Sequence, residues 1–195
     1  MLHLDGRNFS GSGTIVRFGV PLAALAGQDL HLTHIRARRD PPGLRPQHLT
    51  AVEAVTHMCQ GSLEGGAVGS QELLFRPGRL PLGGRFQWDI GTAGSTTMLA
   101  LALLPVAAFA QGSLSFHLTG GLFQDFAPSA FPLQHALLPL LRHMGLHADL
   151  RIVRPGYVPR GGGSLQWKES RCQMRCMTPL PFGAVSLPVP RILSR

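Results

Sequence analysis

The stretch Pro21-Leu22-Ala23-Ala24-Leu25-Ala26, followed by Leu30 and Leu32, decides the fold because it occurs nearly twice in the chain. Its partner is Pro105-Val106-Ala107-Ala108-Phe109-Ala110, followed by Leu114 and Phe116, at an offset of 84 residues. A second pair of similar segments runs from Gln47-His48 to His57-Met58 and from Gln134-His135 to His143-Met144. Similarity at a near-constant spacing indicates two copies of one supersecondary unit.

Each copy has the same expected order of elements. A short strand and a Gly-rich turn (residues 2–13 and 86–95) precede an apolar helix, and an alternating strand follows (residues 30–35 and 114–118). A Pro-containing loop, a second amphipathic helix and closing strands complete the copy. In the second helix of the first copy, Leu49, Val52, Val55 and Met58 recur every three residues, which predicts one buried face. We therefore expect an α/β fold of the layered α+β kind.

The composition of the chain predicts where these units begin and end. The Gly/Pro-rich segment 76–84 predicts the junction, with residues 1–78 as the first repeat and residues 79–163 as the second. Residues 164–195 contain scattered prolines without a sustained period, which predicts an irregular or disordered tail. The longest apolar run, residues 98–110, is shorter than the ~20 residues that span a bilayer, so we expect a buried helix and no membrane partner.

The charge of the chain suggests a polyanionic partner. Its 195 residues carry a formal net charge of +8, and Lys168 is the only lysine, so arginine supplies almost all of the positive charge. The alternative is that arginine-rich composition only keeps the domain soluble. Three cysteines, Cys59, Cys172 and Cys176, favour a reducing, cytoplasmic location, and the Cys172-x-x-x-Cys176 pair most simply represents two unpaired thiols.

Two glycine turns and one arginine-rich loop are candidates for phosphate binding. Gly11-Ser12-Gly13 and Gly94-Ser95 each precede a predicted helix, whose N–H groups attract anions, although a tight turn alone would explain the glycines. The loop over residues 35–48 contains Arg36, Arg38, Arg39 and Arg45, and guanidinium groups suit phosphate oxygens. His48 is a phosphate ligand, an acid/base group, a helix cap or a packed surface residue. No Ser/His/Asp or Cys/His order can be read from the spacing.

A long collinear set of motifs resembles the RNA 3'-terminal phosphate cyclase family. The matching residues are Leu4-Asp5-Gly6, Gly11-x-Gly13-x-Ile15-Val16-Arg17, Ile35-Arg36-Ala37-x-Arg39, Pro42-Gly43-Leu44-Arg45-Pro46-Gln47-His48-Leu49, Gly69-Ser70, Phe75-x-Pro77-Gly78, Thr92-Ala93-Gly94-Ser95, Gly120-Gly121, Ala127-Pro128 and Arg154-x-Gly156-Tyr157-x-Pro159-x-Gly161-Gly162-Gly163. They extend from about residue 2 to residue 163.

The resemblance implies an ATP- and divalent-metal-dependent enzyme of the ligase class that converts an RNA 3'-phosphate into a 2',3'-cyclic phosphate. It also implies three repeats of a four-stranded sheet with two helices, of which this chain would hold two. The inserted domain, the third repeat and the nucleophilic histidine would lie beyond the chain, so we expect no catalytic residue in it.

The resemblance also assigns binding residues. Arg17, Arg36, Arg39, Gln47 and His48 would contact phosphate or the RNA 3'-end, and Gly11, Gly13, Gly94 and Ser95 would lie on the nucleotide side. Three positions depart from the family pattern: Ser10 replaces an acidic residue, Leu101 a glutamine, and the region of Phe131 an aspartate. These departures favour weakened metal and ATP binding.

Three interpretations remain open at this point. The chain is a cyclase by descent whose activity is lost with its missing part, a non-catalytic RNA-binding or RNA-processing relative, or a non-functional fragment. The tail after Gly163 favours the fragment over the RNA-binding relative.

Overall fold

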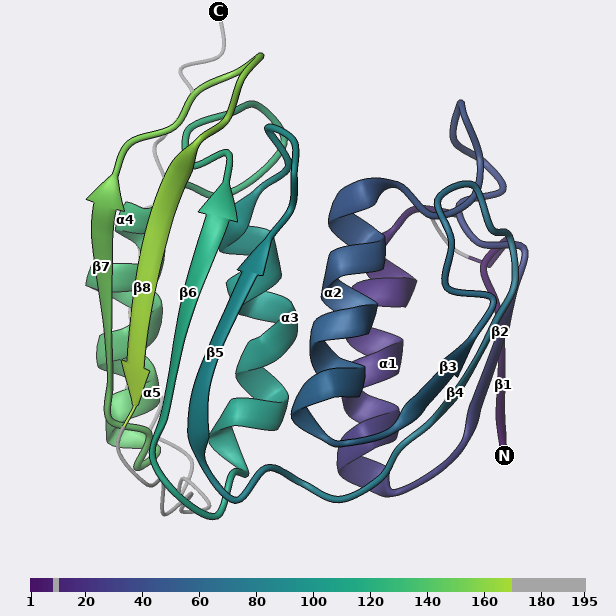
Figure 1. Cartoon of the computed structure of the whole chain (residues 1–195), viewed down its shortest axis with the longest axis horizontal. Coiled ribbons are helices and arrows are strands. Elements are labelled where there is room, and N and C mark those ends of the chain that lie inside the picture. Colours follow the sequence, from purple (N-terminus) through teal and green to yellow (C-terminus); the bar gives the residue numbers. More distant parts are fainter. Residues whose placement is uncertain (9–10, 170–195) are drawn as a thin grey trace, which may run out of the picture.

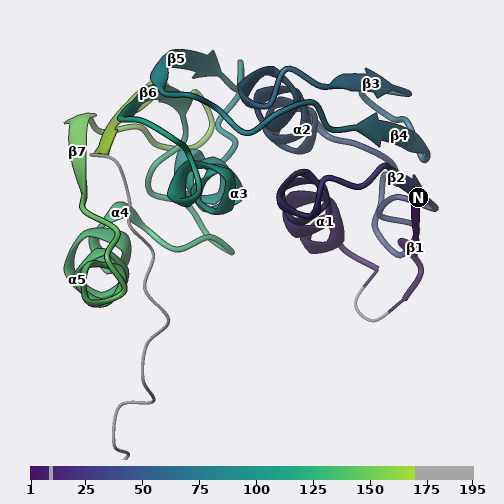
Figure 2. The ribbon, with the colours of Figure 1, turned by 90° about the horizontal axis from the view of Figure 1, so that it is seen from below.

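Two α/β units make up the part of the chain that the structure describes, residues 1–8 and 11–169 of a computed structural model. In Figure 1 the two sheets lie on the outside and the helices α1, α2 and α3 lie between them. Figure 2 shows the same arrangement from below, with α3 against one sheet and α1 and α2 against the other.

The first unit consists of β1 (Leu2–Asp5), α1 (Thr14–Ala26), β2 (Leu30–Thr33), α2 (Pro46–Met58), β3 (Ser62–Glu64) and β4 (Leu73–Arg76). Its sheet has the order β1-β2-β4-β3, in which β1 and β2 are parallel and the other neighbours are antiparallel. Leu30 and Leu32 of β2 are buried on the helix side, as alternation predicts. Gly27 ends α1 with φ 62°, and its N–H donates to Ala23 and Ala24 carbonyls.

The second unit repeats this plan. It consists of β5 (Gly84–Asp89), α3 (Thr96–Ala108), β6 (Leu114–Gly120), α4 (Ala130–Pro132), the π-helical segment η1 (Leu133–Leu137), α5 (Leu138–His143), β7 (Ala148–Arg154) and β8 (Gly163–Glu169). The sheet order β5-β6-β8-β7, with β5 and β6 parallel, matches that of the first unit strand for strand. Helices α1 and α3 connect equivalent strands, so the predicted tandem repeat is confirmed.

The second unit extends further than the sequence predicted. Residues 164–169, which were expected to belong to an irregular tail, form most of β8 and pair with both β6 and β7. Leu165 and Trp167 are buried, whereas Gln166 and Lys168 lie on the opposite face, so the segment does alternate, but over too few residues to stand out. Cys172 and Cys176 lie outside the described residues.

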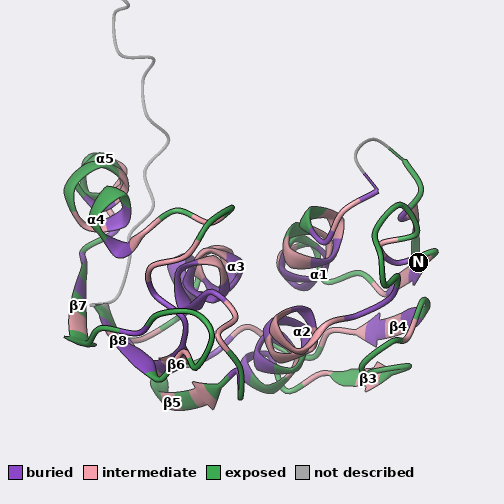
Figure 3. Cartoon of the chain, turned by 90° about the horizontal axis from the view of Figure 1, so that it is seen from above, coloured by how far each residue is buried: buried purple, intermediate pink, exposed green. Residues whose placement is uncertain are grey.

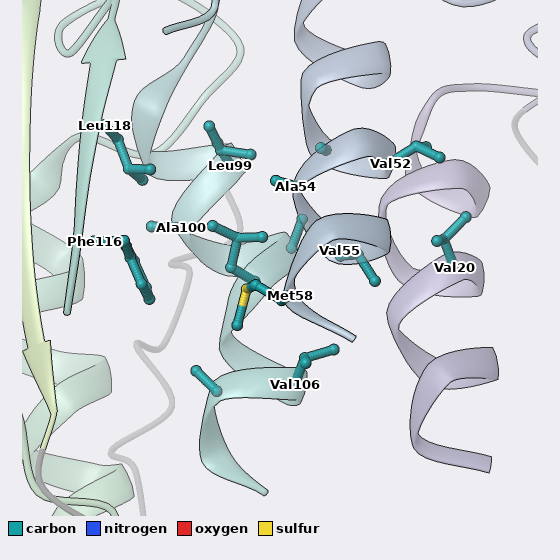
Figure 4. Packing of buried hydrophobic residues seen from close by; sticks show 14 of the residues in the cluster. Val20, Val52, Ala54, Val55, Met58, Leu99, Ala100, Val106, Phe116 and Leu118 are labelled. Carbon is teal, nitrogen blue, oxygen red and sulfur yellow. The ribbon is translucent and has the colours of Figure 1, made fainter. Parts of the chain in front are cut away.

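One core joins the two units through α2 and α3. Figure 4 shows Ala54 and Met58 of α2 directed toward α3, while Phe116 and Leu118 of β6 approach α3 from the other side. Helix α3 carries no charged residue and most of it is buried, as Figure 3 shows, which confirms the buried helix expected over residues 98–110. Among residues 1–8 and 11–169, no helix has the length and apolarity to cross a membrane.

Candidate phosphate-binding site

His48 lies at the centre of the candidate site. It occupies the third position of α2, and only 3% of it is exposed. Its Nδ1 faces the backbone N–H of Arg45 at 3.4 Å, and its Nε2 lies 3.1 Å from Nη1 of Arg17. The histidine therefore does contact the start of its own helix, as the capping interpretation expected, but it also reaches across to α1.

Gly13 makes this approach possible. A Cβ atom on Gly13 would lie 2.0 Å from Nε2 of His48, so any side chain at this position would displace the imidazole. Because α1 begins directly after Gly13, Arg17 stands one turn further along the same helix and its guanidinium meets the ring. Glycine is thus required here for space rather than for its backbone angles, with φ of −70°.

The electrostatic surroundings keep His48 neutral. Burial lowers its pKa to about 3, and the positive charges of Arg17, Arg36 and Arg45 add to this effect. Burial also lowers the pKa of Arg17, with a further contribution from the charge of Arg36. The cations therefore lie close enough to repel one another, and the histidine at their centre does not add a further charge.

The site contains more hydrogen-bond donors than acceptors. A neutral imidazole accepts at one nitrogen only, yet both nitrogens of His48 face donors, from Arg45 and from Arg17. In addition, Nε of Arg17 is buried and has no hydrogen-bond partner among the described residues. Buried donors normally have partners, so the pocket lacks an acceptor that a bound anion would supply.

The arginine-rich loop is held in shape by one of its own side chains. Arg36, with φ 53°, donates from Nη1 to the carbonyl oxygens of Pro41 and Gly43 at 2.9 Å each. Burial lowers the pKa of Arg36, and the positive charges of Arg45 and Arg39 lower it further. Arg36 is therefore both a support of the loop and a member of the cation cluster, while Arg39 is exposed at its edge.

No carboxylate neutralises this cluster among the described residues. The ion pairs that the described residues form are Arg7 with Asp5, His34 with Asp5, His31 with Glu72 and Arg76 with Glu64. Arg17, Arg36, Arg39 and Arg45 take part in none of them. A group of cations without carboxylate partners suits an anionic ligand.

The second unit borders one side of the site, where its Ser95 turn contacts Gln47 of α2. The side-chain oxygen of Gln47 accepts from the N–H of Ser95 at 3.4 Å, and a Cβ on Gly94 would lie 2.9 Å from the Cβ of Gln47. The N–H of Thr96 donates to the carbonyl of Gly121 at 2.9 Å, and Ser95 Oγ accepts from the N–H of Met98. The N–H groups of Thr96 and Met98 in the first turn of α3 thus already have partners within the protein.

The structure brings most of the predicted site residues together. Gly13 and Arg17 contact His48 directly, and the charge of Arg36 acts on both Arg17 and His48. Gln47, Gly94 and Ser95 form the adjoining wall. Gly11, with φ 54°, abuts the side chain of Arg38 instead. Arg45 was predicted only as one of the four arginines of the loop and not among the residues that the resemblance assigns, although its charge acts on both His48 and Arg36.

The described residues do not form a site for a resident metal ion. No group of three or more His, Cys, Asp or Glu side chains in residues 1–8 and 11–169 is placed to hold one. The carboxylate of Asp5 is engaged by Arg7 and His34. The donors of this pocket fit a phosphate and not a divalent cation.

Comparison with known proteins places the chain in a family. The family model of the RNA 3'-terminal phosphate cyclases matches residues 9–181, so the chain belongs to this family. An RNA 3'-terminal phosphate cyclase of Nitrosospira multiformis is 44% identical over 165 residues, which cover 85% of this chain and 46% of that protein. Cyclases of Desulfurococcus amylolyticus and Pyrococcus abyssi are each 40% identical, over 89% and 88% of this chain and 48% and 51% of their own lengths.

The chain thus spans about half the length of the curated relatives that it matches.

Proposed function

We propose that Arg17, Arg36, Arg39, Gln47 and His48 bind the 3'-terminal phosphate of an RNA. The observation that carries this proposal is the shortage of acceptors around His48, where two donors face one neutral imidazole and Nε of Arg17 has no partner. A phosphate offers several acceptor oxygens, and guanidinium groups bind them through paired hydrogen bonds. RNA is the ligand that the names of the relatives indicate.

A bound phosphate would also change the state of His48. The ring is neutral because burial and three arginines lower its pKa to about 3. A phosphate dianion beside the ring would offset these cations and raise the pKa. His48 would then donate a hydrogen bond to a phosphate oxygen and orient the terminal group.

The reaction that this site would serve is the ATP-dependent conversion of the 3'-phosphate into a 2',3'-cyclic phosphate. ATP would supply the adenylyl group that activates the phosphate toward the neighbouring 2'-OH. We assign Gly11, Gly13, Gly94 and Ser95 to the nucleotide side. The N–H of Ser95 could donate to a nucleotide phosphate only after its hydrogen bond to Gln47 is broken. We derive no step from a metal ion, because the described donors do not fit one.

For the 195 residues by themselves we propose binding without turnover. The family resemblance assigns the nucleophilic histidine to a segment that these residues do not include. A cytoplasmic location belongs to the same proposal and rests on the low cysteine content.

The test compares the affinity of the chain for one short single-stranded RNA that ends in a 3'-phosphate or a 3'-OH. Fluorescence anisotropy should show tighter binding of the phosphate form. Arg17→Gln should remove this preference, because it removes the buried guanidinium and keeps most of the stem. Circular dichroism spectra check that the variant is folded.

A matched control separates the pocket from general charge. Arg151→Ala removes one exposed arginine from β7 in the second unit and should keep the preference for the 3'-phosphate. Equal affinity of the parent for both RNA forms would contradict the proposal, and so would an undiminished preference in folded Arg17→Gln.

A further inference from the structure

Four aromatic rings form a partly exposed row in the second unit. Tyr157 stacks on Phe123 with ring centroids 5.5 Å apart, Phe123 lies 5.7 Å from Phe131, and Phe131 stacks on His135 at 6.4 Å. Tyr157 is 60% exposed and Phe131 51% exposed. Single exposed apolar residues are common on protein surfaces, whereas a contiguous group of exposed rings indicates a binding surface.

The aromatic row adjoins the phosphate-binding site. Ser95, which donates to Gln47, forms a parallel bridge with Gly121, two residues before Phe123. Phe123 in turn bridges to Tyr157, and its N–H donates to the carbonyl of Gly156 at 3.2 Å. A few residues of hydrogen-bonded backbone therefore link the rings to the wall of the site.

The loop that carries Tyr157 borders the site as well. The N–H of Gly161 donates to the carbonyl of Tyr157 at 2.7 Å, which closes the loop. A Cβ on Gly161 would lie 2.9 Å from Cα of Ala93, so this loop packs closely on the turn that holds Gly94 and Ser95. Exposed Arg160 follows Tyr157 by three residues in the same loop, and Asp125 is the nearest carboxylate in sequence to Phe123.

We propose that this aromatic row stacks the bases at the 3'-end of the RNA, which rests on the proposed function of the adjoining site. Aromatic rings recognise unpaired bases by stacking, and a neighbouring cationic group holds the backbone phosphates. An apolar protein segment would gain nothing from the uncompensated arginines, whereas a single-stranded RNA uses both surfaces at once. Stacking tolerates any base, so this surface selects single-stranded ends over paired ends without reading sequence.

The experiment uses a 3'-phosphorylated RNA whose last base is 2-aminopurine, and the same RNA with an abasic last nucleotide. Binding to the chain should quench the fluorophore, and the base should improve affinity about five- to 150-fold over the abasic form. The double variant Phe131→Ala/Tyr157→Ala should lose the quenching and most of this difference. Tyr157→Phe keeps the ring and should behave like the parent.

The control is Phe109→Ala, which removes a half-exposed ring at the far end of α3 and should change neither readout. The inference is overturned if the parent binds both RNAs equally, or if the folded double variant still quenches the fluorophore. The proposed phosphate site is tested separately, by the difference in affinity between RNA with a 3'-phosphate and RNA with a 3'-OH. That preference should persist in Phe131→Ala/Tyr157→Ala.

Discussion

Burial and like charge act together on a single residue, His48. Its ring is almost inaccessible and lies among Arg17, Arg36 and Arg45, so a proton on it would be costly in the folded chain. In the unfolded chain the ring is solvated and takes up a proton near its usual pKa of 6.5. The two states therefore bind different numbers of protons over a definite range of pH.

We predict that His48 makes the chain less stable as the pH falls from about 6.5 toward about 3. The folded pKa is depressed, so below pH 6.5 protonation favours the unfolded state, by at most about 1.4 kcal/mol per pH unit. His48→Gln should lower this dependence. Urea midpoints at several pH values between neutrality and mild acid measure it.

The control for this prediction is His143→Gln, which removes an exposed histidine of α5 and leaves the pocket intact. It should keep the parental dependence. An identical slope for His48→Gln and the parent would show that the ring titrates normally in the folded chain.

The start of α3 shows how one element depends on buried hydroxyl groups. Thr97 is fully buried, and its Oγ1 donates to the carbonyl of Pro128 at 2.6 Å and lies 2.7 Å from Ser95 Oγ. These bonds connect the helix N-terminus to the segment that leads into the aromatic row. They also connect Thr97 to Ser95, whose N–H donates to Gln47 of the candidate phosphate-binding site.

Thr97→Val should lower the free energy of unfolding by about 1–3 kcal/mol, because it leaves the Pro128 carbonyl without its donor while keeping the side-chain volume. Chemical denaturation measures the loss. Thr97→Ser keeps the hydroxyl and should lose much less. A valine variant as stable as the parent would mean that water or another donor replaces the hydroxyl.

Sequence patterns predicted elements well where an apolar period was uninterrupted. Leu30 and Leu32 of β2, and Val52, Val55 and Met58 of α2, are buried as their spacing indicates. The second helix of the second copy was predicted as one amphipathic helix but is divided into α4, η1 and α5. Pro132 and Pro139 lie in this stretch and each removes a backbone donor, which explains the irregular hydrogen bonding.

Local sequence patterns predicted the site less well than the helices and strands, because the contacts of the site join distant segments. Arg17 and His48 are 31 residues apart, and Gln47 and Ser95 are 48 apart. The family resemblance grouped Arg17 with His48, but it assigned Gln47 to the phosphate side and Ser95 to the nucleotide side. The aromatic row was not predicted at all, since Phe123, Phe131 and Tyr157 follow no shared period and meet only through the bridge between two loops.

At the scale of the whole molecule, the two repeats share one core, so we expect them to unfold together. Met58 of α2 is 2% exposed and faces α3, as Figure 4 shows. Met58→Ala should destabilise the chain by about 2–5 kcal/mol through the cavity that it leaves. Urea unfolding is followed by far-UV circular dichroism for both units and by tryptophan fluorescence for the second, which contains Trp88 and Trp167.

Both signals should give one midpoint, and both midpoints should fall in Met58→Ala. Leu82→Ala, at an exposed position between the units, is the control and should change neither by much. Separate midpoints in the parent would show that the repeats fold independently and that the α2–α3 contact contributes little.

The net charge of +8 is spread over the whole chain, so its position rather than its sum should govern RNA binding. Each phosphate contact releases counterions and adds about 0.7 to the slope of log K against log salt concentration for single strands. Arg36→Ala/Arg39→Ala should weaken binding about equally for unrelated RNAs, because backbone contacts read no bases, and the loss of two contacts should flatten that slope by about 1.4 units. Since Arg36 also supports the loop, Arg39→Ala alone isolates the loss of charge. Arg142→Ala/Arg151→Ala lowers the net charge by the same amount on α5 and β7 and should leave the slope nearly unchanged. If both double variants flattened the slope equally, RNA would respond to total charge, and the loop would be an ordinary solvated surface.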